Sequence, residues 1–184
     1  MINDIFVDVK ERMAKALDHY RQEVSTVRTG RASSNILDLI KVDYYGTMTA
    51  LNNMANVSVP EAQLIVVQPF DPTSLESIER AILNSDLGLT PNNDGNVIRL
   101  NIPSLTEERR KEFVKIVHKM IEDGRVAIRN IRRDVNDHLK KMEKDGDLSE
   151  DNLKRALDNV QETTDEFIKE LNALQEMKEK ELMI

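Results

Sequence analysis

Cysteine is absent from this chain of 184 residues, and so is tryptophan. Without cysteine there can be no disulfide, no thiolate metal ligand and no cysteine nucleophile. The absence also fits a reducing compartment. Aromatic residues make up only 4% of the sequence, whereas 32% of its residues are charged. This composition indicates a protein with much exposed helix surface rather than one wide globular core.

Long apolar runs are absent as well. No stretch of the sequence approaches the roughly 18 apolar residues that a membrane span needs. The first residues, MINDIFVDVKERM, mix charged and apolar side chains from the start and lack the apolar segment of a signal peptide. We therefore expect a cytoplasmic protein without a membrane partner. The three histidines, His19, His118 and His138, are too scattered to predict a metal site, and we expect no cofactor.

Three segments have the apolar periodicity of long amphipathic helices. The first covers about residues 3–28, with Asn3 or Asp4 as its cap. The third begins at Ser149, directly after the turn KDGD at 144–147. Its apolar seam consists of Leu153, Leu157, Val160, Thr164, Phe167, Leu171 and Leu174. Because each seam is too narrow to be stable alone, the three helices are predicted to form an up-down-up bundle.

The second helix covers about residues 106–143, with Thr106 as its N-cap. Its seam alternates spacings of three and four residues, which favours left-handed packing. The seam residues are Val114, Val117, Ile121, Gly124, Ile128, Ile131, Val135, His138 and Met142. Gly124 predicts a close approach between helices or a slight bend. His138 is predicted to be a packed histidine at the core or its edge.

The sequence between the first two helices breaks this pattern. The stretches KVDYYG, ANVSV, QLIVVQPF and NVIRLNI have the composition of short strands between turns. One helix, SLESIERAILNSDLG, lies among them, starting near Pro72 or Thr73 and ending at Gly88. The fold class is therefore α+β with two domains. Residues 1–29 and 105–184 form the bundle, and residues 30–104 form an inserted β/α/β domain. The two connections, Thr29-Gly30-Arg31 and Pro103-Ser104-Leu105, can act as a hinge.

Basic residues gather on one flank of the second helix although the net charge of the chain is −7. Residues 105–145 hold 12 Lys and Arg against 9 Asp and Glu, whereas the rest of the chain holds 14 against 24. We call this flank the basic stripe; its residues are Lys111, Lys115, His118, Lys119, Arg125, Arg129, Arg132, Arg133 and Lys140. Glu122 is its main acidic interruption.

Two interpretations of the basic stripe compete. Its arginines can pair with acidic residues of the third helix, such as Asp158, Glu162 and Asp165. However, surface ion pairs contribute little stability and explain such a cluster poorly. Arginine binds phosphate through a planar pair of donors, and the stripe is long enough to follow a nucleic-acid backbone. Because no aromatic residues alternate with the arginines, contact with phosphates of a structured RNA is favoured over stacking on single strands.

Six passages in order along the whole chain resemble the ribosome recycling factor family. They are RTGRAS at 28–33, VDYYGT at 42–47, SDLGLTPN at 85–92, LTEERRKE at 105–112, RVAIRNIRRD at 125–134 and KELM at 180–183. The resemblance implies an L-shaped protein similar in outline to transfer RNA, with a three-helix bundle and a β/α/β domain at a hinge. This chain departs from the family at Met48 and Ala50, where proline is frequent.

The resemblance also implies a function in translation termination. A member of this family is expected to bind the post-termination ribosome through large-subunit ribosomal RNA. With elongation factor G, which carries GTP, it splits the ribosome into subunits and releases it from mRNA. Such a factor is not an enzyme, and we expect a monomer. The family's RNA contacts correspond to Arg129 and Arg132 of RNIRRD and to Arg110 of EERRKE; Arg133 and Arg125 join them from the basic stripe. Arg28 and Arg31 either contribute or only fix the hinge.

Two other classes of function make different predictions. A coiled-coil adaptor that binds only proteins would show no salt-sensitive affinity for ribosomal RNA. A hydrolase in the inserted domain would need a convergent polar pocket. Residues 31–104 contain no His and no Cys with which to build one.

Overall fold

A computed structural model describes residues 1–183 and divides the chain into two compact units. The first unit consists of Met1–Thr29 and of the chain from Glu107 onward; the second is Gly30–Thr106. Leu105 and Thr106 therefore belong to the inserted unit, two residues beyond the boundary that the sequence suggested. We describe each unit by itself.

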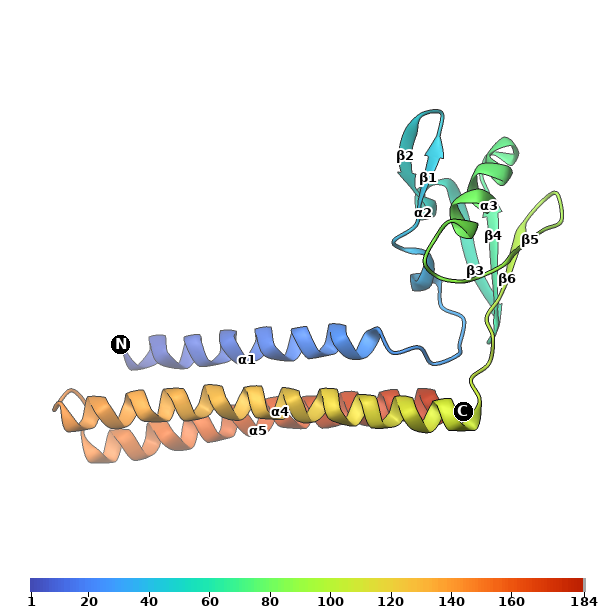
Figure 1. Cartoon of the computed structure of the whole chain (residues 1–184). Helices are drawn as coiled ribbons and strands as arrows, with labels where there is room; N and C mark the ends of the chain where they lie inside the picture. Colours follow the sequence, from blue (N-terminus) through green and yellow to red (C-terminus); the bar gives the residue numbers. More distant parts are fainter. Residues whose placement is uncertain (184) are drawn as a thin grey trace. The chain divides into compact units, whose positions relative to one another are not determined.

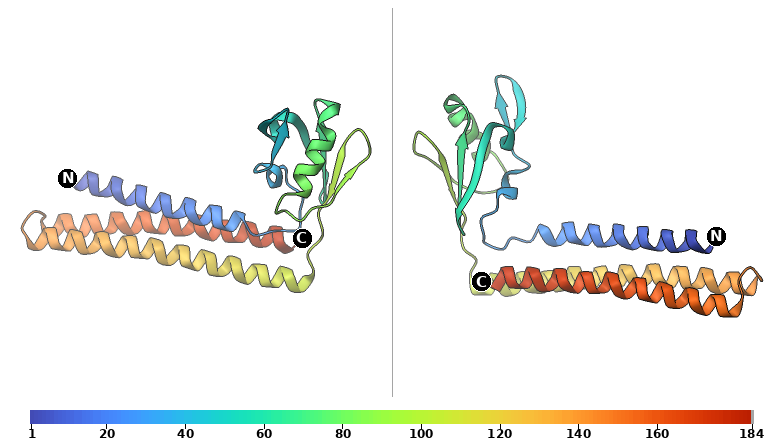
Figure 2. Two further views of the ribbon diagram at one scale, coloured as in Figure 1. Left: turned by 45° about the horizontal axis from the view of Figure 1, so that its top comes forward. Right: turned by 180° about the vertical axis from the view of Figure 1, so that it is seen from behind.

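The first unit is a bundle of α1 (Ile2–Ser25), α4 (Glu107–Lys144) and α5 (Glu150–Met183). A turn with Gly146 at φ +83° joins α4 to the antiparallel α5. Helix α1 lies along both, with its N-terminus near that turn (Figures 1 and 2). The apolar seams of the three helices form the core, so the predicted bundle is confirmed. Fully buried core residues include Met13 of α1, Ile121 and Ile128 of α4, and Leu171 of α5.

Gly124 marks a close approach of all three helices. A Cβ atom at this position would lie 3.2 Å from Cγ of Tyr20 in α1 and 3.3 Å from Cδ2 of Leu171 in α5. The close approach that the sequence suggested at Gly124 is therefore present.

The ends of α1 differ from the prediction. The helix begins at Ile2 with Met1 in the cap position, so neither Asn3 nor Asp4 caps it. It ends at Ser25 rather than near residue 28. The hydroxyl of Ser25 donates to the carbonyl oxygen of Gln22 over 2.5 Å, and that of Thr26 donates to the carbonyl of Glu23 over 2.6 Å. Such local bonds compete with continued helix, which explains the earlier end.

Two details of the predicted seams are wrong. His138 is exposed, and Leu139 is buried in its place. A straight helix drifts against a strict seven-residue repeat, so the buried position after Val135 is Leu139, while Met142 is buried as predicted. In α5 the buried residues include Ala156, Thr163 and Lys178, which the predicted seam left out. The amine of Lys178 lies 3.7 Å from a carboxylate oxygen of Glu181.

The inserted unit contains a four-stranded antiparallel sheet in the order β3-β4-β6-β5. Its strands are β3 (Ala55–Glu61), β4 (Leu64–Pro69), β5 (Pro91–Asn93) and β6 (Ile98–Asn101). A separate hairpin of β1 (Lys41–Tyr44) and β2 (Thr47–Ala50) precedes it. The helices are α2 (Leu51–Met54) and α3 (Leu75–Leu83), with 3-10 turns at Ser34–Leu37 and Pro72–Ser74. The buried core includes Leu37, Ile65, Ile78 and Leu100.

The prediction for this unit misses two strands and overextends its helix. β2 and β5 were not predicted, because their sequences TMTA and PNN become strands only by pairing with β1 and β6. α3 ends at Leu83, five residues before the predicted stop at Gly88. There the Ser85 hydroxyl donates to the carbonyl of Ile82 over 2.6 Å and closes the last turn.

The two connections to the bundle touch within the inserted unit. Gly30 has φ +72°, and a Cβ atom there would lie 3.0 Å from Cγ and 3.1 Å from the backbone nitrogen of Leu105. Nearby, the amide of Ala32 donates to the carbonyl of Ala62 over 2.7 Å, and that of Ile102 donates to Gln63 over 2.8 Å. Only glycine combines this φ with so close an approach at low cost.

Candidate nucleic-acid interface

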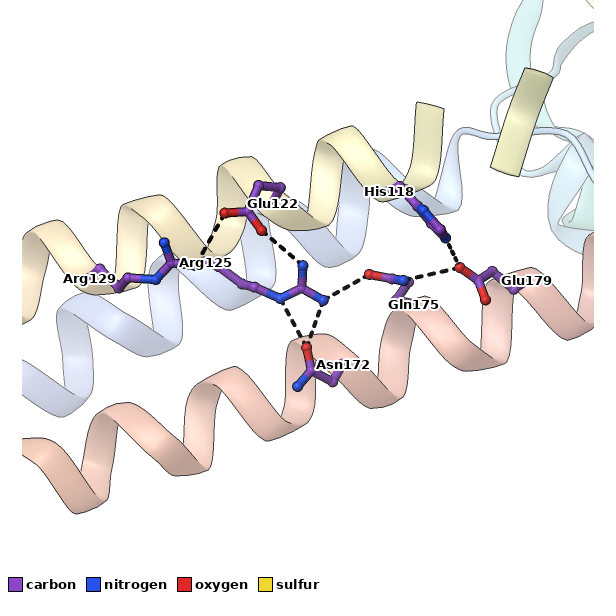
Figure 3. A network of polar contacts seen from close by, with 7 residues as sticks. All are labelled: His118, Glu122, Arg125, Arg129, Asn172, Gln175 and Glu179. Carbon is purple, nitrogen blue, oxygen red and sulfur yellow. Dashed lines mark hydrogen bonds and ion pairs between the residues drawn. The ribbon is translucent and has the colours of Figure 1, made fainter. Parts of the chain in front are cut away.

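The best-anchored residue of the basic stripe is Arg125. Its Nε and one terminal nitrogen donate to Oδ1 of Asn172 over 3.0 and 2.7 Å. The same terminal nitrogen donates to Oε1 of Gln175 over 2.9 Å, and the other donates to Glu122 over 3.0 Å. Figure 3 shows this guanidinium lying between α4 and α5. Four of its five N–H groups are engaged, and its side chain is only 22% exposed.

Glu122, which looked like an interruption of the stripe, bridges two of its arginines. One carboxylate oxygen accepts from Arg125, and the other accepts from Arg129 over 3.2 Å (Figure 3). Hydrogen bonds from Arg125 and then from Arg129 hold the pKa of Glu122 below its ordinary value. Arg129 donates through one nitrogen only, and its side chain is 40% exposed. Most of its donors therefore remain available.

Arg132 and Arg133 form fewer hydrogen bonds within the protein than Arg125 does. Arg132 donates one hydrogen bond, to Oε1 of Gln161 over 3.1 Å. The amide nitrogen of Gln161 in turn donates to Asp165 over 2.8 Å. Arg133 is exposed and forms no hydrogen bond or ion pair with any residue of 1–183. The number of internal hydrogen bonds thus falls from four at Arg125 to one at Arg129, one at Arg132 and none at Arg133.

The partners of the stripe on α5 are mainly uncharged amides. Gln161, Asn172 and Gln175 accept from the arginines, whereas none of Asp158, Glu162 and Asp165 contacts one directly. His118 is an exception because it pairs with Glu179, which also accepts from Gln175 (Figure 3). No sequence pattern identified these amides. The antiparallel register of α4 and α5 could have pointed to them.

Arg110 is not a member of the basic stripe and lies near its N-terminal end on α4. It is half-buried near the start of α4, and its Nε is buried without an acceptor among residues 1–183. A buried donor without a partner costs about 1–3 kcal/mol. Arg28 is exposed and Arg31 half-buried, and neither forms a hydrogen bond or ion pair with the described residues.

Metal-binding clusters and hollows were the other places where a functional site could lie. No group of three or more His, Cys, Asp or Glu within residues 1–183 is arranged to hold a metal ion. The hollow beside α3 in the inserted unit, about 640 Å³ in volume, has the charged residues Lys41, Asp43, Arg80 and Asp86 along a largely apolar lining. No helix in the described part of the chain is long and apolar enough to cross a membrane.

The described fold combines a helical bundle that carries a basic flank on α4 with an inserted antiparallel sheet. The family model described as "Ribosome recycling factor" matches residues 20–183 of this chain. The chain belongs to the ribosome recycling factor family, whose members are non-enzymatic translation factors. The resemblance seen in the sequence is thereby confirmed. The alternative of a hydrolase in the inserted domain is not.

Relatives and solved structures agree with this assignment. The chain is 50% identical to the ribosome-recycling factor of Bacillus subtilis (strain 168) and 54% identical to that of Syntrophomonas wolfei. Each comparison covers 100% of this chain and 99% of the relative. A solution structure of the ribosome recycling factor is 43% identical, with a TM-score of 0.79 over 99% of this chain and 97% of its own.

A further solved structure places a relative in its working context. It is that of the T. thermophilus ribosome recycling factor, described with E. coli elongation factor G as bound to the E. coli post-termination complex. This chain is 44% identical to it, with a TM-score of 0.67 and full coverage of both chains.

Proposed function

We propose that this protein binds the post-termination ribosome by placing the basic stripe of α4 against large-subunit ribosomal RNA. Together with elongation factor G and GTP, it then splits the ribosome into subunits. It acts as a monomer in the cytoplasm and uses no cofactor of its own. Its family and the T. thermophilus relative on the post-termination complex support this assignment.

The observation that carries the RNA contact is the set of unused donors on Arg129, Arg132 and Arg133. The first two donate one internal hydrogen bond each, and Arg133 donates none to residues 1–183. A guanidinium fixed at one nitrogen can still present its other N–H groups to a phosphate. Arg110 is included through its match to the family passage EERRKE. Arg125 has almost no donor left, so direct phosphate contact by Arg125 is not part of this proposal.

Arg132→Ala tests the RNA contact. Arg132 lies beside the core rather than in it, so the melting temperature should change little. Each charge-assisted hydrogen bond lost contributes roughly 1.5–3 kcal/mol, so ribosome affinity should fall by about tenfold to over a hundredfold. The slope of log affinity against log salt should also flatten by about 0.7–0.9. Melting and ribosome binding at several salt concentrations provide both readouts. A much lower melting temperature with unchanged binding per folded molecule would mean that Arg132 serves the bundle instead.

We further propose that elongation factor G acts on the inserted unit while the bundle stays on the RNA. The short connections past Gly30 and Leu105 are what would transmit force. A test variant carries two extra glycines in each connection, between Arg28 and Thr29 and between Leu105 and Thr106. This variant should bind ribosomes normally but split them into subunits more slowly. Normal splitting by this lengthened variant would show that the connections transmit no force.

A further inference from the structure

Helix α5 meets the arginines of the basic stripe with acceptors that carry no net charge. Asn172 and Gln175 accept three of the four hydrogen bonds from Arg125, and Gln161 accepts the one from Arg132. All three acceptors are amide oxygens, although α5 also carries ten carboxylates. A carboxylate would hold the guanidinium more strongly but would cancel its charge. An amide fixes the same geometry and leaves the full positive charge for an anion.

We infer that Gln161, Asn172 and Gln175 are positioning residues for RNA binding: they orient the arginines of α4 without neutralising them. This inference rests on the proposed function above. Gln161 acts directly on Arg132, which has its remaining donors free for phosphate. Its own amide nitrogen donates to Asp165 over 2.8 Å, which fixes which end of the amide faces the arginine.

The effect of Asn172 and Gln175 reaches the RNA indirectly. Both amides accept hydrogen bonds from Arg125. Arg125 also donates to Glu122 over 3.0 Å, and Glu122 accepts from Arg129 over 3.2 Å. Figure 3 shows this sequence of contacts running from α5 through Arg125 to Arg129. Arg125 is therefore itself a positioning residue, and Arg129 is the group that it serves. The one carboxylate in this path lies on α4 and is shared between two cations, so a positive charge remains.

Positioning contributes to affinity because a free arginine side chain must be ordered when it binds. Ordering one rotamer-rich side chain costs about 0.5–1.5 kcal/mol at an interface. At about 1.4 kcal/mol per tenfold change, loss of a positioning residue should weaken ribosome binding about 2- to 10-fold. The number of phosphate contacts stays the same, so the salt slope should not change. Loss of an arginine, by contrast, changes both affinity and slope.

Gln161→Ala and Gln161→Glu separate orientation from charge. Gln161→Ala should weaken binding to purified ribosomes about 2- to 10-fold with an unchanged salt slope. Gln161→Glu keeps an acceptor for Arg132 but pairs its charge, so the salt slope should flatten by up to about 0.9. Asn159 supplies the matched control because it is an exposed amide on the same helix, and its side chain forms no hydrogen bond with residues 1–183. Asn159→Ala and Asn159→Asp should change neither readout by a comparable amount.

The indirect path has its own test. Asn172→Ala should weaken binding by a similar factor in the wild-type background and have little effect once Arg129 is alanine, because both changes act through one contact. Thermal melting of every variant corrects for any unfolded fraction. The positioning role would be overturned if Gln161→Ala and Asn172→Ala bound ribosomes as well as Asn159→Ala does. If Arg132→Ala still bound weakly in that case, the proposed function would stay intact. No change in Arg132→Ala would instead refute the proposed function.

Discussion

Helix α4 has α1 along one flank and α5 along another, and its charged residues are paired differently on the two. Toward α1, Asp134 accepts a charged hydrogen bond from Arg12 over 2.8 Å, and Asp8 lies 3.8 Å from the same guanidinium nitrogen. Opposite charges meet there and cancel. Toward α5, arginines meet amide oxygens and keep their charge. The difference matches the proposed function, in which the charges toward α1 stabilise the bundle and the arginines toward α5 bind RNA.

Charge reversal on each flank should give the largest contrast. Arg132→Glu removes a phosphate contact and adds repulsion, so ribosome affinity should fall more than a hundredfold, beyond about 3 kcal/mol. Arg12→Glu places a third acid beside Asp8 and Asp134, and should lower the free energy of unfolding by about 1 kcal/mol or less. Its ribosome affinity per folded molecule should stay near that of the wild type. Similar losses of affinity in both variants would remove the distinction between the flanks.

A smaller contrast is expected within the basic stripe itself. Arg125→Ala deletes four hydrogen bonds from a side chain that is 22% exposed, and should lower the free energy of unfolding by about 1–2 kcal/mol. Arg133→Ala should lower it by less than about 0.5 kcal/mol, because Arg133 is exposed and has no partner in residues 1–183. Urea unfolding measures both values. If Arg133→Ala proves the more destabilising change, the gradient from engaged to free arginines is wrong.

The smallest effect concerns pH. Because the pKa of Glu122 is lowered in the folded protein from an ordinary value of 4.5, its contribution to stability is fully present above that value. The contribution is lost as the pH falls through the folded-state pKa. Glu122→Gln should therefore be less stable than the wild type at pH 7, and the difference should shrink below about pH 4.5. A difference in unfolding free energy that stays constant from pH 7 to pH 3 would argue against the bridge.

Sequence patterns predicted the long helices of this molecule better than its short strands. The three amphipathic helices could be read because their seams repeat over many turns. The strands β2 and β5 could not, since TMTA and PNN become strands only when β1 and β6 lie beside them. His138 was misplaced because a strict seven-residue repeat does not follow a real helix over about eight turns. The basic stripe was visible in one segment of sequence, whereas its partners on α5 lie 29 to 50 residues away.

By itself the sequence determined the family, because six passages match it in order along the chain. It also determined the three amphipathic helices and the position of the arginines along α4, because these depend on residues near one another in the chain. Only the tertiary structure decided which arginine is held and which is free. That choice depends on the antiparallel register of α4 and α5, which sets Asn172 and Gln175 opposite Arg125 and leaves Arg133 without a partner among residues 1–183. Eight residues separate Arg125 from Arg133, which is about 2.2 turns of helix, so Arg133 is rotated by about 80° around α4 relative to Arg125.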